Sequence, residues 1–287
     1  MNTTLRAALW MIGAVGSFTA MALAGRALGS TYDTFEIMLY RSAIGLIIVL
    51  AVASWADTLR EINTQAVPLH GLRNLVHFIG QNLWFYAVTA IPLAQVFALE
   101  FTTPLWVIVL SPLLLGERLT PVRGVGALLG FIGILIVARP GAVTLSAGTI
   151  AAASCAIFFA LTFVFTKRLT RSQSITAIMF FLTLIQLGLG LLCVFYDGQV
   201  TWPTVPTLPL LALVGLCGLL AHFCITQALK IAPATIVAPI DFARLPLVAI
   251  LAMLIYREPL EVWVFVGAIV IFSGNYLNIW AETRKAG

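Results

Sequence analysis

Apolar runs of about twenty residues, separated by short turn-forming segments, follow one another along the whole chain. A helix of about that length crosses the ~30 Å hydrocarbon core of a bilayer. The runs predict ten transmembrane helices, near residues 7–28, 34–54, 70–90, 93–115, 119–138, 147–167, 174–195, 207–230, 234–256 and 260–281. The predicted fold class is therefore an all-α integral membrane protein.

The composition agrees with this fold class and excludes several functions. Hydrophobic residues make up 61% of the chain and charged residues only 9%, whereas a soluble domain carries about 25% charged residues. The loops are too short for a soluble domain, so any chemistry lies within the bundle. Catalytic patterns such as G-x-S-x-G, H-E-x-x-H and the Walker sequence are missing. We therefore expect no enzyme, no cofactor, no metal and no nucleic-acid partner.

The two halves of the chain match at a constant offset of 141 residues (241 − 100). The offset aligns Arg26 with Lys167, Pro92 with Pro233, Glu100 with Asp241, and Glu117 with Glu258. This indicates two repeats of five helices, residues 1–141 and 142–287. Because five is odd, the second repeat starts on the opposite side of the membrane. Such inverted repeats are typical of secondary transporters, which hold substrate near the midplane.

Basic residues in loops and tails predict the orientation. One side carries Arg6, Arg60, Arg73, Arg118, Arg123, Lys167, Arg168, Arg171, Lys230, Arg284 and Lys285, and the other side carries only Arg26, Arg139 and Arg257. This bias predicts that both termini of the multi-pass chain lie in the cytoplasm.

Four charged residues fall inside predicted spans: Arg41, Glu100, Asp241 and Arg244. Each costs about 2.5–3.5 kcal/mol at a helix centre, so we expect them to pair or to face water. Asp241 and Arg244 are three residues apart and share a helical face. Glu100 needs a partner from another helix, and we expect Arg41. Two interpretations stay open: structural locks, or groups that hold substrate or a proton.

Polar side chains form a stripe along the third predicted helix. Asn74, His77, Gln81 and Trp84 follow one another at helical spacing, and His222 aligns with Gln81 in the other repeat. A stripe of this kind favours a cavity-lining face over isolated packing contacts. A lone histidine is more often a packing group, but the stripe makes His77 the preferred cavity residue. His222 is the second.

Prolines and glycines mark two further features of the bundle. Pro104 follows Glu100 by four residues, and Pro239 and Pro246 flank Asp241, which predicts breaks in the backbone ladder beside both acids. Glycines recur in the fifth and tenth predicted helices and predict close helix packing. They are Gly124, Gly126, Gly130, Gly133, Gly267 and Gly274.

Three stretches resemble a known family: FEIMLYRSAIG (35–45), GERLTPVRGVGALLGFIGILIVARPG (116–141) and REPLEVWVFVGAIVIFSG (257–274). The chain resembles the drug/metabolite transporter superfamily, in the group built from two EamA domains. The resemblance implies alternating access through a cavity lined by the first four helices of each half, with the fifth and tenth peripheral. It also implies a structural role for Glu117 and Glu258.

We therefore predict a secondary transporter of a small amphipathic metabolite in a bacterial inner membrane, with amino acid export favoured. In this hypothesis Arg41 meets a substrate carboxylate and Glu100 or Asp241 an amino group. The pocket is completed by His77, Gln81, Trp84, Phe101, His222 and Arg244.

Several alternatives remain. The YRSAIG and DFARLP stretches resemble a branch with S-adenosylmethionine transporters, so uptake of a nucleotide-like metabolite or vitamin is the main one. A channel and an intramembrane enzyme are others. Proton coupling and the choice between monomer and homodimer stay open.

Overall fold

The computed structural model describes residues 3–117, 120–138, 146–198, 200–258 and 262–285. Regular structure in these ranges is helical throughout, as the fold class predicts. The helices are α1 (Thr3–Leu28), α2 (Thr34–Trp55), η1 (Leu59–Glu61), α3 (Val67–Ala90), α4 (Leu93–Glu100), α5 (Thr103–Leu115), α6 (Pro121–Ala138), α7 (Ala147–Leu169), α8 (Ile175–Asp197), α9 (Leu208–Ile231), α10 (Ala234–Ile240), η2 (Asp241–Ala243), α11 (Arg244–Tyr256) and α12 (Val262–Lys285).

Ten helical spans result in the described part of the chain, because α4 and α5 form one span and α10, η2 and α11 form another. The chain is thus a ten-helix membrane protein built from two inverted five-helix repeats. Seven of the described spans are long and apolar enough to cross a membrane by length and composition alone. Helix α3 is not among them, and α3 carries the polar stripe.

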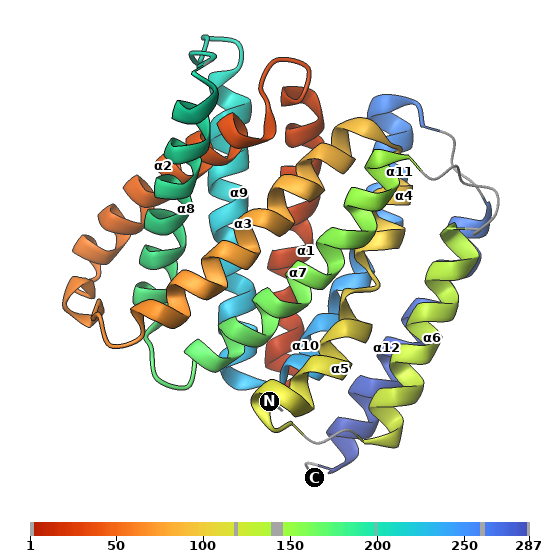
Figure 1. Ribbon diagram of the computed structural model, residues 1–287. Coiled ribbons are helices and arrows are strands. Elements are labelled where there is room, and N and C mark those ends of the chain that lie inside the picture. The colour runs from red at the N-terminus through yellow and green to blue at the C-terminus, as the bar shows by residue number, and fades with distance from the viewer. Residues whose placement is uncertain (1–2, 118–119, 139–145, 199, 259–261, 286–287) are drawn as a thin grey trace.

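Helices of one repeat pack mainly against helices of the other. Helix α1 lies along α9, α3 along α7, and α2 along α8 (Figure 1). The offset of 141 residues converts the α1–α9 pair into the α7–α3 pair, so the packing is that of a pseudo-twofold arrangement. Helices α6 and α12 pair with each other at one edge of the bundle (Figure 1), where the family resemblance places the fifth and tenth helices.

Two basic side chains cap the C-terminal ends of helices in the same way in both repeats. Arg26 donates to carbonyl oxygens at the end of α3, and Lys167 donates to carbonyl oxygens at the end of α9. The acceptors are Val88 and Ile91 for Arg26, at 3.2 and 3.1 Å, and Leu229 and Ala232 for Lys167, at 2.5 and 2.8 Å. Cations at helix C-termini neutralise the terminal carbonyl groups.

Two glutamates cap helices across the repeat boundary. Glu258 accepts a hydrogen bond from the Leu93 amide at the start of α4 (3.0 Å) and pairs with Arg26 (2.9 Å). Its counterpart Glu117 accepts from the Ala234 amide at the start of α10 (3.1 Å). Carboxylates stabilise helix N-termini, so each acid ties its own repeat to the other one. The two caps lie toward opposite ends of the bundle (Figure 1).

The glycines of α6 and α12 allow part of the predicted close packing. A Cβ on Gly274 would lie 2.6 Å from the Gly126 carbonyl oxygen, so the two backbones touch there. A Cβ on Gly130 would meet the Phe242 ring, whereas Gly124 has nothing within 4 Å. Close packing therefore involves the middle of α6 and does not extend to Gly124.

Some sequence predictions lie outside the described residues. They are the repeat boundary between residues 141 and 142, and the positions of Arg118 and Arg139 in the orientation count.

Candidate substrate-binding site

Both acidic residues sit where a membrane span is broken. Helix α4 ends at Glu100 and α5 begins at Thr103, whose hydroxyl donates to the Glu100 carbonyl oxygen at 2.5 Å. In the other repeat, the short 3-10 turn η2 begins at Asp241. The predicted spans over 93–115 and 234–256 are confirmed, and so are the predicted breaks beside the acids.

A buried triad forms between the two breaks. Arg244 Nη2 lies 2.6 Å from Glu100 Oε1 and 2.6 Å from Asp241 Oδ2. Trp84 Nε1 donates to Glu100 Oε2, also at 2.6 Å. The Asp241–Arg244 pair is confirmed, but the predicted pair of Glu100 with Arg41 is wrong. Helical spacing identifies partners within one helix, whereas the partner across helices depends on how each helix is rotated.

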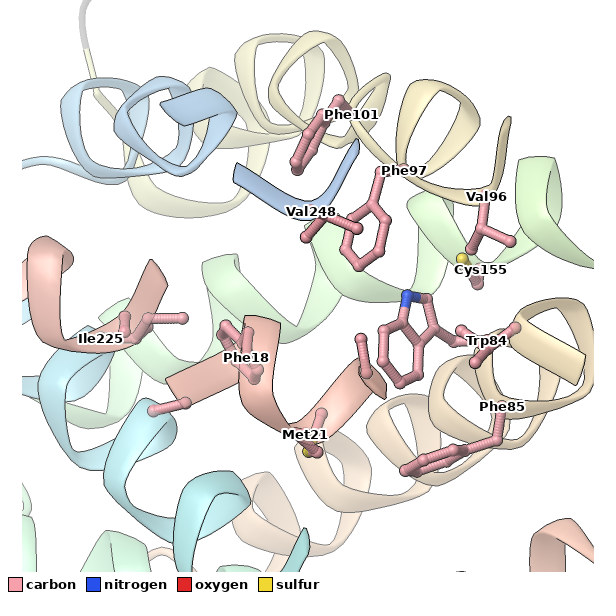
Figure 2. Packing of buried hydrophobic residues seen from close by; sticks show 14 of the residues in the cluster. Phe18, Met21, Trp84, Phe85, Val96, Phe97, Phe101, Cys155, Ile225 and Val248 are labelled. Atoms are coloured by element: carbon pink, nitrogen blue, oxygen red, sulfur yellow. The ribbon is translucent and has the colours of Figure 1, made fainter. Parts of the chain in front are cut away.

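Aromatic rings surround the Arg244 guanidinium. Its Cζ lies 4.9 Å from the ring centroids of Phe18 and Phe97 and 5.3 Å from that of Phe101. Figure 2 shows Phe18 from α1, Trp84 from α3, and Phe97 and Phe101 from α4 and the residue that follows it, gathered in one region. The faces of aromatic rings carry negative quadrupole charge and attract a cation. The rings and the carboxylates therefore both stabilise the Arg244 guanidinium.

Arg41 binds a different residue and lies behind the cavity wall. Its Nη1 donates to Gln81 Oε1 at 2.9 Å. A Cβ on Gly218 would collide with the guanidinium, and one on Gly215 would meet Ile44 and the Arg41 backbone. Gly218 aligns with His77 at the 141-residue offset, so the glycine in the second repeat makes room for the arginine.

Arg73 is a third buried cation, although its place in the sequence predicts a loop residue. The side chain is 1% exposed. Its Nε donates to Thr166 Oγ1 (3.1 Å) and its Nη1 to Asn74 Oδ1 (2.8 Å). The predicted span 70–90 contains Arg73 in its first turn, near enough to the end to be counted with the loops, whereas α3 begins at Val67 and places Arg73 almost two turns inside. The signal that identifies it is its neighbour Asn74 in the polar stripe.

The two predicted histidines meet in the bundle. The ring centroids of His77 and His222 are 4.5 Å apart and the rings are perpendicular. Both side chains are buried. Within the described ranges, both ring nitrogens of His77 and Nε2 of His222 have no hydrogen-bond partner. Buried polar groups are normally satisfied, so these nitrogens are free to bind a ligand or water.

One cavity joins the triad to the histidines. All the predicted site residues except Arg41 line it, together with residues that the sequence analysis did not select: Phe18, Met21, Arg73, Thr103, Pro104, Phe159, Thr162, Phe163, Thr166, Ile225 and Ala238. Its volume is about 50 Å³, which holds a few waters. The missed residues come mainly from α1 and α7, where uninterrupted apolar sequence gives no sign of which face is inside.

A profile of the EamA-like transporter family matches residues 5–139 and 146–280. A riboflavin transporter of Vibrio cholerae is 30% identical over 98% of this chain and 95% of its own length. An S-adenosylmethionine uptake transporter of Rickettsia bellii is 24% identical over 96% of this chain and 94% of its own.

A solved crystal structure has the same fold, with a TM-score of 0.80 at 21% identity over 98% of this chain and 99% of that one. Because the family profile covers both halves of the chain, the protein belongs to the EamA-like transporter family, of the drug/metabolite transporter superfamily, and moves a small molecule across a membrane.

Proposed function

We propose that the protein takes up a flat heteroaromatic metabolite, with riboflavin as the leading candidate, by alternating access through the central cavity. The observation that carries the proposal is a buried cavity walled by aromatic rings with polar donors at one end. Relatives named riboflavin transporters match almost the whole chain at 30% and 29% identity. This cargo replaces the amino acid favoured by the sequence, which the relatives do not support.

The walls of the cavity suit a planar cargo. Phe18, Phe101, Phe159 and Phe163 line it with Trp84, and aromatic rings stack on or meet the edges of planar ligands. Riboflavin offers an uncharged three-ring system with carbonyl oxygens along one edge. Gln81, Arg73 and the two histidines supply hydrogen bonds at one end of the same cavity.

Alternating access requires the cavity to enlarge. Pockets for ligands of this size span about 300–1,000 Å³, whereas the present volume is about 50 Å³. The breaks at Glu100 and Asp241 lie beside the cavity, on the spans that the cross-repeat glutamates cap. We infer that cargo enters when the helices at one capped end separate and leaves when those at the other end do. We place the protein in a bacterial inner membrane with both termini in the cytoplasm.

A second candidate cargo is S-adenosylmethionine, which carries a positively charged sulfonium. The triad of Glu100, Asp241 and Arg244 has one more carboxylate than guanidinium, and aromatic rings surround it. A cation is attracted by both features. This candidate is supported by the relatives named S-adenosylmethionine uptake transporters.

Uptake into proteoliposomes tests both cargoes. We expect saturable uptake of labelled riboflavin and its inhibition by unlabelled riboflavin, with no effect of phenylalanine. Glu100→Gln removes one negative charge from the triad, so it should weaken S-adenosylmethionine transport by roughly tenfold or more while riboflavin transport changes little. Uptake of neither compound would rule out both cargoes. Flux without saturation or counterflow would indicate a channel.

A further inference from the structure

Two guanidinium groups near the histidines have no carboxylate partner among the residues that the structure describes. Arg41 is 5% exposed and Arg73 is 1% exposed. Among the side chains that the structure describes, their hydrogen-bond partners are neutral: Gln81 for Arg41, and Thr166 and Asn74 for Arg73. Buried charge without a counter-charge is unfavourable. This end of the cavity therefore attracts negative charge, unlike the triad, where Arg244 meets two carboxylates.

The free polar atoms at this end are mostly donors. Arg41 occupies Oε1 of Gln81, which leaves the amide NH₂ of Gln81 as its free group. Arg73 uses Nε and Nη1 for protein contacts and keeps Nη2. His77 and His222 each bring a ring with at least one unpartnered nitrogen in the described part of the bundle. Such a donor set fits an acceptor-rich edge or a carboxylate.

A flat surface adjoins these donors. The Phe159 ring lies beside His77, with centroids 6.1 Å apart, and both rings line the cavity. Phe163 lines the cavity from the same helix, α7. An acceptor group carried directly on a planar ring would reach the donors while the ring packs against these side chains.

We propose that Arg73, Gln81, His77 and His222 form a subsite for an anionic or acceptor-rich group attached to a planar ring, with Arg41 as the residue that positions Gln81. The subsite's part in selecting cargo rests on the proposed function, where it would hold the carbonyl edge of a flavin. Its affinity for a ring carboxylate is a property of these residues alone.

Benzoate is a probe of this chemistry, and benzamidine is its matched control with a cationic group on the same ring. Thermal unfolding and calorimetry of the purified full chain in detergent should show that benzoate binds and raises the melting temperature. Benzamidine should bind at least tenfold more weakly at this site, because the guanidinium groups repel it.

Gln81→Glu tests the subsite without a change of shape. It gives Arg41 a carboxylate partner and should leave the fold as stable as before, while benzoate affinity falls at least tenfold because the donor becomes an anion. Gln95→Glu is the control, since Gln95 donates to Thr149 outside the cavity. Arg73→Gln keeps polar contacts with Thr166 and Asn74 but removes the charge, and should also weaken benzoate roughly tenfold.

The outcomes separate this proposal from the proposed function. The subsite is wrong, even where riboflavin is transported, if benzoate does not bind or if benzamidine displaces benzoate as well as benzoate itself does. It is also wrong if both Gln81→Glu and Arg73→Gln bind benzoate as the unmodified chain does. If riboflavin is not transported but benzoate binding is lost in the variants, the subsite stands and the cargo is another planar acceptor.

Discussion

At the scale of single residues, Arg244 is the counter-charge for two buried carboxylates. Arg244→Met leaves Glu100 and Asp241 without a cation, and removal of one partner of a buried pair costs about 3–5 kcal/mol. Glu100→Gln costs less, because Arg244 keeps Asp241 and Trp84 can still donate to the amide oxygen. We expect a much larger loss of thermal stability for Arg244→Met.

The double variant is the sharper measurement. Glu100→Gln added to Arg244→Met removes one of the two stranded carboxylates, so it should recover part of the lost stability. Coupling energies within such networks are about 0.5–3 kcal/mol. Melting temperatures of the four proteins in detergent give the coupling. Additive losses would mean that the three side chains do not act as one network.

Gly218 provides the space that the Arg41 side chain occupies. Gly218→Ala should displace the guanidinium from Gln81, because the new methyl group collides with it. The fold should change little, since alanine favours a helix over glycine by about 1 kcal/mol and a guanidinium can move. Cargo affinity should fall roughly tenfold through the loss of a charged hydrogen bond, as measured by binding.

Gly71→Ala is the control for this substitution. A Cβ at Gly71 has nothing within 4 Å, so the variant should keep its cargo affinity and gain slightly in stability. Equal affinities for Gly218→Ala and the unmodified chain would show that the position of Arg41 does not matter to the site.

The sequence predicted fewer than half of the residues that line the cavity, and it predicted the wrong partner for Glu100. Helical spacing placed His77, Gln81 and Trp84 on one face, and all three line the cavity. The sequence favoured Arg41 as the partner of Glu100 because both needed a partner. Contacts between helices depend instead on how each helix is rotated about its axis and on small residues in the facing helix. The role of Gly218 follows only from the structure, because its repeat counterpart is a histidine.

At the scale of helices, four residues end helices or turns with positive φ, in two pairs separated by 141 residues. Gly116 (φ 68°) corresponds to Arg257 (φ 56°), and Asp57 (φ 54°) to Gly198 (φ 70°). A side chain in the left-handed region costs roughly 1–2 kcal/mol. Each pair therefore contains one glycine that suits the turn and one residue that is strained in it.

Arg257→Gly should relieve this strain and raise the free energy of unfolding by about 1 kcal/mol. Gly116→Ala should lower it by a similar amount, because Gly116 ends α5 in the same conformation. Chemical unfolding in detergent measures both. Arg257→Ala removes the charge but keeps the strain, because alanine also carries a Cβ. A gain of stability in that variant as well would attribute the effect to charge.

The sequence predicted where these spans end but not how they end. The 141-residue offset aligned Gly116 with Arg257 and Glu117 with Glu258. Arginine gives no sign of a left-handed turn, and a glutamate in a loop gives no sign that it caps a helix of the other repeat. Both features depend on contacts between segments far apart in sequence.

At the scale of the whole molecule, the two inverted repeats hold the bundle together by equivalent contacts at its opposite ends. The Glu258–Arg26 pair joins the start of α4 to the end of α3 at one end. At the other end, Glu117 caps the start of α10 and Lys167 caps the end of α9. The constant offset and the odd number of helices predicted this symmetry, because duplication with inversion places matching residues of the two repeats at opposite ends of the bundle.

Each cap should govern the opening of its own end. Glu258→Gln weakens the cap on α4 and the pair with Arg26 by about 1 kcal/mol, and it should favour the conformation open at that end. Glu117→Gln should favour the opposite conformation. A cysteine at Thr162, which lines the cavity, reports the difference through labelling by a membrane-impermeant thiol reagent, with the four native cysteines replaced.

Labelling in right-side-out and inside-out vesicles should shift in opposite directions for the two variants, by roughly fivefold for 1 kcal/mol. Glu61→Gln, in the exposed turn η1, is the matched control and should leave labelling unchanged. If both cap variants increase labelling from the same side, the caps do not govern the two ends separately, and the pseudo-twofold relation does not extend to the opening of the cavity.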